Sequence, residues 1–165
     1  MKKVTYINAM PYQFDKNHKV AHYLLTNGKY RNHGEFLESV VKYHLGIFTD
    51  VNPNTTWSNG SDIEIFHISV KSDGACIGRN FGDIHDPNKQ IAFYFRYVPS
   101  STFVWPIMNE KTQEVTEYHM SKREFGKFVN LFTYYTSDSK MKDKAIRFRS
   151  STKKMKKWLD EQCAA

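Results

Sequence analysis

The stretch GEFLESVVKYHLG, residues 34–46, decides the fold class of this chain. Its apolar residues recur at helical spacing and Gly46 supplies a stop, so we predict a helix over 34–45. On a helical wheel with about 100° per residue, Glu38 falls at the edge of the apolar face, whereas Glu35 points nearly opposite. A carboxylate at the edge of a buried helix face can point along the surface of the sheet into a cleft.

Two short strands are predicted after this helix. A turn-rich stretch leads into 62–65 and then 67–71, which could form a tight hairpin. Lys71 closes the second strand, and burying an ammonium group is costly unless a carboxylate or a ligand lies close. We therefore expect Glu38, Asp62 and Lys71 to meet in one groove. There two carboxylates could hold Mg²⁺, and the lysine could orient a water or stabilise charge on a phosphate.

The rest of the chain predicts one domain, residues 1–165, with a sheet flanked by helices rather than a helix bundle. A short helix at 20–25, a loop carrying Arg79, strands at 91–98, 102–107, 115–120 and 145–150, and a final helix at 151–162 are expected. A second strong helix begins at Ser121, which forms a capping-box pattern with Glu124. The apolar stripe of this helix is Phe125, Phe128, Val129, Phe132 and Tyr135.

The charge of the chain favours a polyanionic partner. The sequence holds 24 Lys and Arg against 17 Asp and Glu, a formal net charge of +7. Neutralising phosphates with such cations releases counterions, so nucleic acid is the expected partner, although solubility alone would also explain the charge. With two cysteines, no CxxC and no apolar run long enough to cross a bilayer, we expect a cytoplasmic protein that does not bind membranes.

The segment from Gly34 to Gly46, then Ser61-Asp62, then Ser69-Val70-Lys71, resembles the core of the PD-(D/E)XK nuclease superfamily. The resemblance implies an α/β fold with a restriction-endonuclease-like mixed central sheet flanked by helices. It also implies Mg²⁺-dependent hydrolysis of phosphodiester bonds in DNA or RNA. The catalytic group that it implies is Glu38, Asp62 and Lys71, and we count Ser69 with them because it occupies the second acidic position of the motif. The expected metal ligands are Glu38 and Asp62, with Glu64 added as a candidate because it would share a strand face with Asp62.

One position departs from the family pattern. Ser69 stands two residues before Lys71, where the family has Glu or Asp, and a hydroxyl carries no charge. Either a carboxylate from elsewhere fills the gap, with Glu64 nearest and Glu38 second, or the protein binds without cutting. The alternative function is therefore a decayed nuclease fold that binds nucleic acid or a host nucleoprotein complex. A phage or mobile-element inhibitor of host defence would be of this kind. A purely structural role ranks last, and the oligomeric state stays open.

Several cations are candidates for phosphate contacts. Arg79 and Lys89 belong to the loop region after the predicted active-site strand. The densest positive segment is the C-terminal run that includes Arg147, Arg149, Lys153 and Lys154, and we expect it to contact phosphates. The aromatic run at 93–97 could stack on bases, but core packing is the better interpretation. The scattered histidines lack the spacing of a zinc site.

Overall fold

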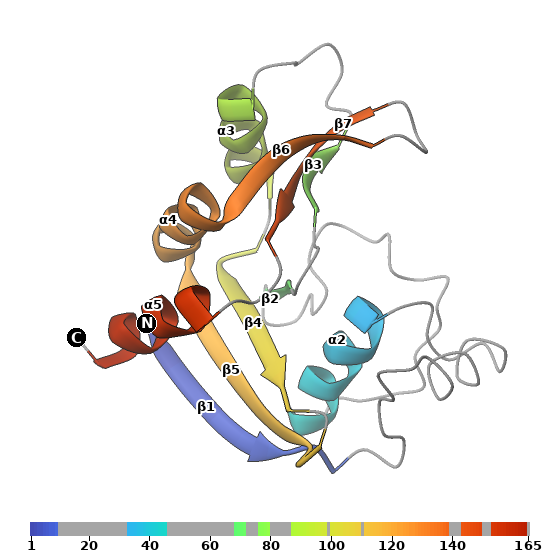
Figure 1. Ribbon diagram of the computed structural model, residues 1–165, viewed down its shortest axis with the longest axis vertical. Helices are drawn as coiled ribbons and strands as arrows, with labels where there is room; N and C mark the ends of the chain where they lie inside the picture. The colour runs from blue at the N-terminus through green and yellow to red at the C-terminus, as the bar shows by residue number, and fades with distance from the viewer. Residues whose placement is uncertain are drawn as a thin grey trace, which may run out of the picture.

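The computed structural model describes residues 1–9, 33–45, 68–71, 76–79, 87–98, 100–109, 111–138, 143–149 and 153–164. Within these ranges the chain forms two β-sheets with helices packed around them (Figure 1). The larger sheet has the order β1 (Lys2–Ile7), β5 (Glu114–Ser121), β4 (Thr102–Met108) and β2 (Ile68–Val70). The smaller sheet has the order β3 (Cys76–Arg79), β7 (Asp143–Phe148) and β6 (Thr133–Asp138).

The larger sheet is mixed. Strands β1, β5 and β4 pair in antiparallel fashion, whereas β2 runs parallel to β4. The smaller sheet is antiparallel throughout. The predicted mixed α/β class is therefore confirmed, with a mixed four-stranded sheet and flanking helices.

Helix α2 (His33–His44) lies on one face of the larger sheet, and α4 (Lys122–Phe132) and α5 (Lys153–Ala164) lie on the other. Val41 of α2 packs against Val104 and Val70. Successive residues of a strand point to opposite faces, so Phe103 and Trp105 point away from α2, into the cluster that α4 and α5 cover. The predicted helix at 34–45 is confirmed.

The main core is built from aromatic rings. Phe103 stacks on Phe125 with centroids 4.2 Å apart, and Trp105 lies 4.9 Å from Phe128 and 4.7 Å from Phe148. All five rings are buried. Truncating a buried aromatic ring to alanine typically costs about 3–5 kcal/mol, so this cluster holds α4 and β7 against the larger sheet.

Helix α4 begins where the sequence predicts, but it ends earlier than the sequence predicts. Ser121 Oγ accepts from Glu124 N at 3.2 Å, and Ser121 N donates to Glu124 Oε1 at 3.0 Å, which completes the capping box. The predicted stripe is buried as far as Phe132. The assignment of Tyr135 to this helix is wrong, because Thr133 is extended and the chain continues as β6. Thr and Tyr favour strands, and the pairing with β7 outweighs another helical turn.

The strand predicted at 91–98 is also wrong, since α3 (Pro87–Tyr97) occupies these residues. The aromatic run is typical of a strand, but the residues that pack on the core recur at helical spacing. They are Ile91, Tyr94, Phe95 and Val98. Pro87 stands at the helix start, where its missing N–H is not needed.

Other expectations have mixed outcomes. The strands at 102–107, 115–120 and 145–150 and the C-terminal helix are confirmed with small boundary shifts. The loop predicted around Arg79 is wrong, because Arg79 ends β3. Strand β1 was not anticipated. The helix predicted at 20–25 and the strand predicted at 62–65 lie outside the described residues. None of the helices in the described ranges is long and apolar enough to cross a membrane.

Candidate nucleic-acid interface

The outer face of the β6–β7 ribbon carries two arginines and a tyrosine. Ile146 and Phe148 are buried in the core. Because side chains alternate along a strand, Arg147 and the exposed Arg149 point to the other face. Tyr134 pairs with Arg147 in the ribbon, and the guanidinium of Arg149 lies 5.4 Å from the Tyr134 ring centroid. A cation over an aromatic face at this distance is an attractive arrangement.

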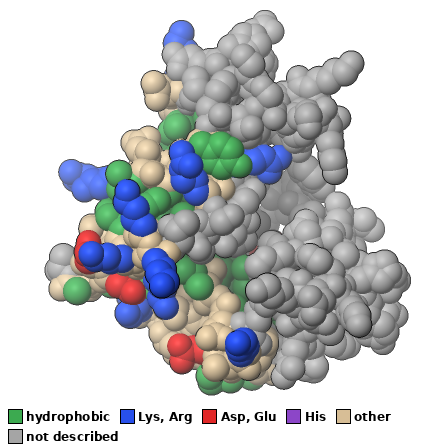
Figure 2. Space-filling model, viewed as in Figure 1, with side chains coloured by type: hydrophobic (Ala, Val, Ile, Leu, Met, Phe, Trp, Pro, Cys, Tyr) green, Lys and Arg blue, Asp and Glu red, His purple; other side chains and the backbone are tan. Residues whose placement is uncertain are grey.

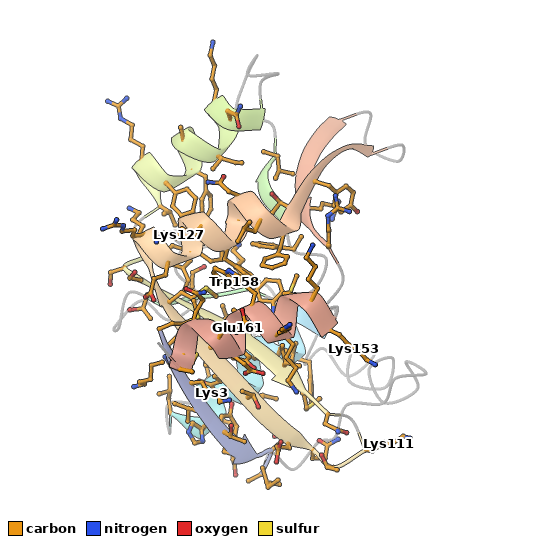
Figure 3. The ribbon with its side chains drawn as sticks, turned by 60° about the vertical axis from the view of Figure 1, so that its left-hand side comes forward. Lys3, Lys111, Lys127, Lys153, Trp158 and Glu161 are labelled. Carbon is orange, nitrogen blue, oxygen red and sulfur yellow. The ribbon has the colours of Figure 1, made fainter. Side chains whose placement is uncertain are left out.

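An open groove of about 730 Å³ runs between the C-terminal end of α4 and helix α5. The described residues that line it are Leu131, Phe132, Arg149, Lys154, Lys157, Trp158 and Glu161. Figure 3 shows Trp158 and Glu161 on α5, with Lys127 on the neighbouring helix α4. The backbone N–H of Arg149 donates to the carbonyl of Phe132 at 2.9 Å, which fixes the end of β7 beside α4.

The periodicity of α5 places its lysines outward. Met155 and Leu159, four residues apart, are fully buried, so the opposite side of the helix faces solvent. Lys154 and Lys157 are exposed on that side. Lys157 Nζ lies 4.0 Å from Glu161 Oε1, with the side chains 79% and 60% exposed. An exposed pair of this kind is worth less than about 1 kcal/mol, so an incoming phosphate can compete for the lysine.

Apolar surface lies among these cations. One side of Trp158 packs on the core, with its ring 5.9 Å from Phe128 and 5.7 Å from Phe132. The indole is only partly buried and also lines the groove. Leu131 is 56% exposed at the same place. The groove therefore offers both charge and an apolar ring surface.

Cations continue from the groove over α4 and α5 (Figure 2). Arg123 and Lys127 are exposed on α4, and Lys153 and Lys156 are exposed on α5. In Figure 2, Lys and Arg side chains are spread across the side of the molecule that carries these two helices. The groove thus lies among further exposed cations of both helices, with the carboxylates of Glu124, Asp160 and Glu161 between them.

Sequence reasoning had singled out some of these residues and missed others. Arg149 and Lys154, predicted as phosphate contacts, both line the groove. Lys153 lies on the same helix and Arg147 on the adjoining ribbon, whereas Lys89 is exposed on α3 and Arg79 ends β3. Tyr134 and the groove-facing side of Trp158 were missed. The alternation of apolar and basic residues at 146–149 was the available signal for the ribbon face.

The described members of the predicted nuclease cluster are carried on different faces of the larger sheet. Glu38 is on α2, and its Oε1 lies 2.7 Å from Lys42 Nζ. Ser69 of β2 pairs with Phe103 of β4, and Ser69 is 2% exposed. Lys71 shares the face of Ser69, and its Nζ lies 5.9 Å from the ring centroid of Tyr94 on α3. The structure does not bring Glu38 and Lys71 into contact.

The other two residues of that cluster, Asp62 and Glu64, lie outside the described residues. The described members do not make a divalent-cation site by themselves, because Glu38 is engaged by Lys42 and Ser69 is neutral. In the part of the chain that the structure describes, no three His, Cys, Asp or Glu side chains are grouped as a metal site would require. Mg²⁺ binding stays a prediction that depends on Asp62 and Glu64.

A second polar cluster, not anticipated from the sequence, joins β1 to β5. Glu117 is 1% exposed, accepts a hydrogen bond from the Tyr6 hydroxyl and has Oε1 2.9 Å from His119 Nε2. Burial, and then the bond to Glu117, raise the pKa of Tyr6 well above its ordinary value, so its hydroxyl remains a donor. The Tyr6 ring also stacks on His44 at 3.6 Å, which ties β1 to the end of α2.

Comparisons with protein-family models, curated proteins and solved structures returned no significant match.

Proposed function

We propose that this protein binds nucleic acid through the basic groove between α4 and α5. The observation that supports the proposal is the composition of the groove wall, where the described charged residues are the cations Arg149, Lys154 and Lys157 and one carboxylate, Glu161. These cations lie within a chain of net charge +7. Lysines and arginines that neutralise phosphates release condensed counterions, and this release supplies most sequence-independent affinity for nucleic acid.

The experiment compares two single charge removals on exposed lysines. Lys157 lines the groove, whereas Lys111 is exposed in the turn after β4, far from α5 (Figure 3). Binding of a fluorescent oligonucleotide is measured by anisotropy at several salt concentrations. We expect Lys157→Gln to weaken binding several-fold and to reduce the slope of log K against log salt by about 1, the effect of one lost phosphate contact.

Lys111→Gln is the matched control and should retain wild-type affinity and slope. If the two variants lose affinity equally, the charge acts diffusely and the groove is not the site. If the wild-type protein binds no oligonucleotide at about 0.15 M salt, where non-specific binders still bind measurably, the proposal itself is wrong.

A second proposal is that the chain also hydrolyses the bound strand with a restriction-endonuclease-like centre. The favourable observation is that, among the described elements, α2 is followed along the chain by β2 of a mixed sheet, with Lys71 directly after the strand. The resemblance implies the same order of helix and lysine-bearing strand, and the strand start that it assigns to Asp62 lies outside the described residues. We further propose that the protein acts in the cytoplasm, where its nucleic-acid partner would be reached.

A further inference from the structure

We infer that the groove takes unpaired nucleic-acid strands in preference to duplexes, with bases stacking on one aromatic ring in the groove and one beside it; this inference rests on the proposed function. The residues that carry it are Tyr134, Trp158 and Arg149. Arg149 connects the two rings, because it lines the groove beside Trp158 and also lies over the ring of Tyr134.

Both rings are accessible in a way that core aromatics are not. Tyr134 is 40% exposed on the outer face of the β6–β7 ribbon, whereas rings such as Phe125 and Phe148 are at most 1% exposed. Trp158 is partly exposed, and its other side is backed by Phe128 and Phe132. A ring with one side supported by the core and the other toward a groove is a rigid platform for a flat ligand.

Stacking of this kind selects for single strands. In a duplex each base is covered above and below by its neighbours, so its flat surface is not free to stack on a protein ring such as Tyr134 or Trp158. An unpaired base can be splayed onto an aromatic ring or an arginine plane, while lysines follow the backbone. Lys154 and Lys157 on the exposed side of α5 are placed for that second role.

An acidic peptide is the other polyanion that such a groove could attract. It would use the three cations but has no need of the exposed aromatic rings. The presence of Tyr134 beneath Arg149 therefore favours a ligand with both phosphates and flat bases.

The test uses the full-length protein with an oligo-dT of about 12 nucleotides, within the usual site size of such grooves, and the same strand annealed to its complement. We expect the single strand to bind at least about tenfold more tightly, the size of one stacking contact.

Tyr134 is chosen for mutation because it is exposed, so the fold should tolerate the change. Tyr134→Leu should lose about tenfold in affinity with an unchanged salt slope, and Tyr134→Phe, which keeps the ring, should bind as the wild type does.

The outcomes separate the two proposals. If the duplex binds as tightly as the single strand, or if Tyr134→Leu binds normally while Lys157→Gln does not, stacking is excluded and charge-based nucleic-acid binding survives. If polyglutamate displaces the oligonucleotide at equal charge concentration, the groove is an acidic-peptide site and the inference is overturned. If neither oligonucleotide binds, the proposed function fails first.

Discussion

The hydroxyl of Tyr6 on β1 donates a hydrogen bond to Oε2 of Glu117 on β5, and that carboxylate is 1% exposed. A buried carboxylate is stable only when its oxygens are hydrogen bonded. The Tyr6–Glu117 bond therefore holds the edge strand β1 to the sheet, in addition to the backbone pairing of the two strands.

Removing the Tyr6 hydroxyl tests this role. We expect Tyr6→Phe to lower the free energy of unfolding by about 1–3 kcal/mol, the cost of leaving a buried polar group without its partner. The Phe ring can still stack on His44, so packing is preserved. Urea denaturation gives the value, and Tyr134→Phe, at an exposed tyrosine, serves as the matched control. Equal stability of the two variants would show that the hydroxyl of Tyr6 contributes nothing to folding.

The helix α4 offers a stabilising change at Gly126. Among the described residues, a methyl group built at this position meets only Phe95, at an ordinary contact distance of 3.9 Å. Glycine in a helix interior costs roughly 0.5–1 kcal/mol relative to alanine. We therefore expect Gly126→Ala to raise the thermal midpoint. A lower midpoint than that of the wild type would mean that the contact with Phe95 is too tight for the helix to adjust.

Stability should depend on pH through Asp160. Its carboxylate accepts from the Tyr118 hydroxyl at 2.6 Å and from Lys3 at 3.3 Å. The bond from Tyr118 and the nearby Lys3 lower the pKa of Asp160, against the opposing effect of burial. A lowered folded-state pKa gives stability that is fully present above the unfolded value, about 4. That stability is lost as the pH falls through the folded value.

Asp160→Asn removes this dependence. The difference in thermal midpoint between wild type and Asp160→Asn should be largest at neutral pH and should shrink below about pH 4, the ordinary range of aspartate titration. The measurement is a series of melts from neutral to acidic buffer. A difference that stays constant through this range would show that the charge of Asp160 is not the stabilising feature.

The nuclease hypothesis is tested at the positions that carry the resemblance. Asp62→Ala and Lys71→Ala should abolish any Mg²⁺-dependent cleavage while leaving the thermal melt cooperative. Cleavage that persists in both variants would dispose of this site. If the scaffold has only lost its second acidic residue, Ser69→Glu should create or strengthen cleavage and Ser69→Gln, of the same length but uncharged, should not.

The two Ser69 variants should also differ in melting temperature. The side chain is 2% exposed, and a buried carboxylate without a partner is costly. Ser69→Glu should therefore melt below Ser69→Gln unless a metal ion compensates. A ligand that binds only the folded state raises its melting temperature, so a Mg²⁺-dependent rise confined to Ser69→Glu would indicate a restored site.

The sequence by itself determined the elements whose signal is local. The α2 and α4 helices follow from apolar residues at helical spacing, and the start of α4 follows from the side chains of Ser121 and Glu124. Charge is also a property of the sequence, and it was sufficient to point to the C-terminal cations before any fold was known.

The tertiary structure decided what depends on partners distant in the chain. Whether residues 91–98 form a strand or a helix was settled by which of their side chains pack on the core, and local propensity favoured the wrong answer. Only the pairing of β6 with β7 and the docking of α5 bring Tyr134, Arg149 and Trp158 to one surface. Contacts of this kind depend on which distant segments pack together, and a short window of sequence does not contain that information.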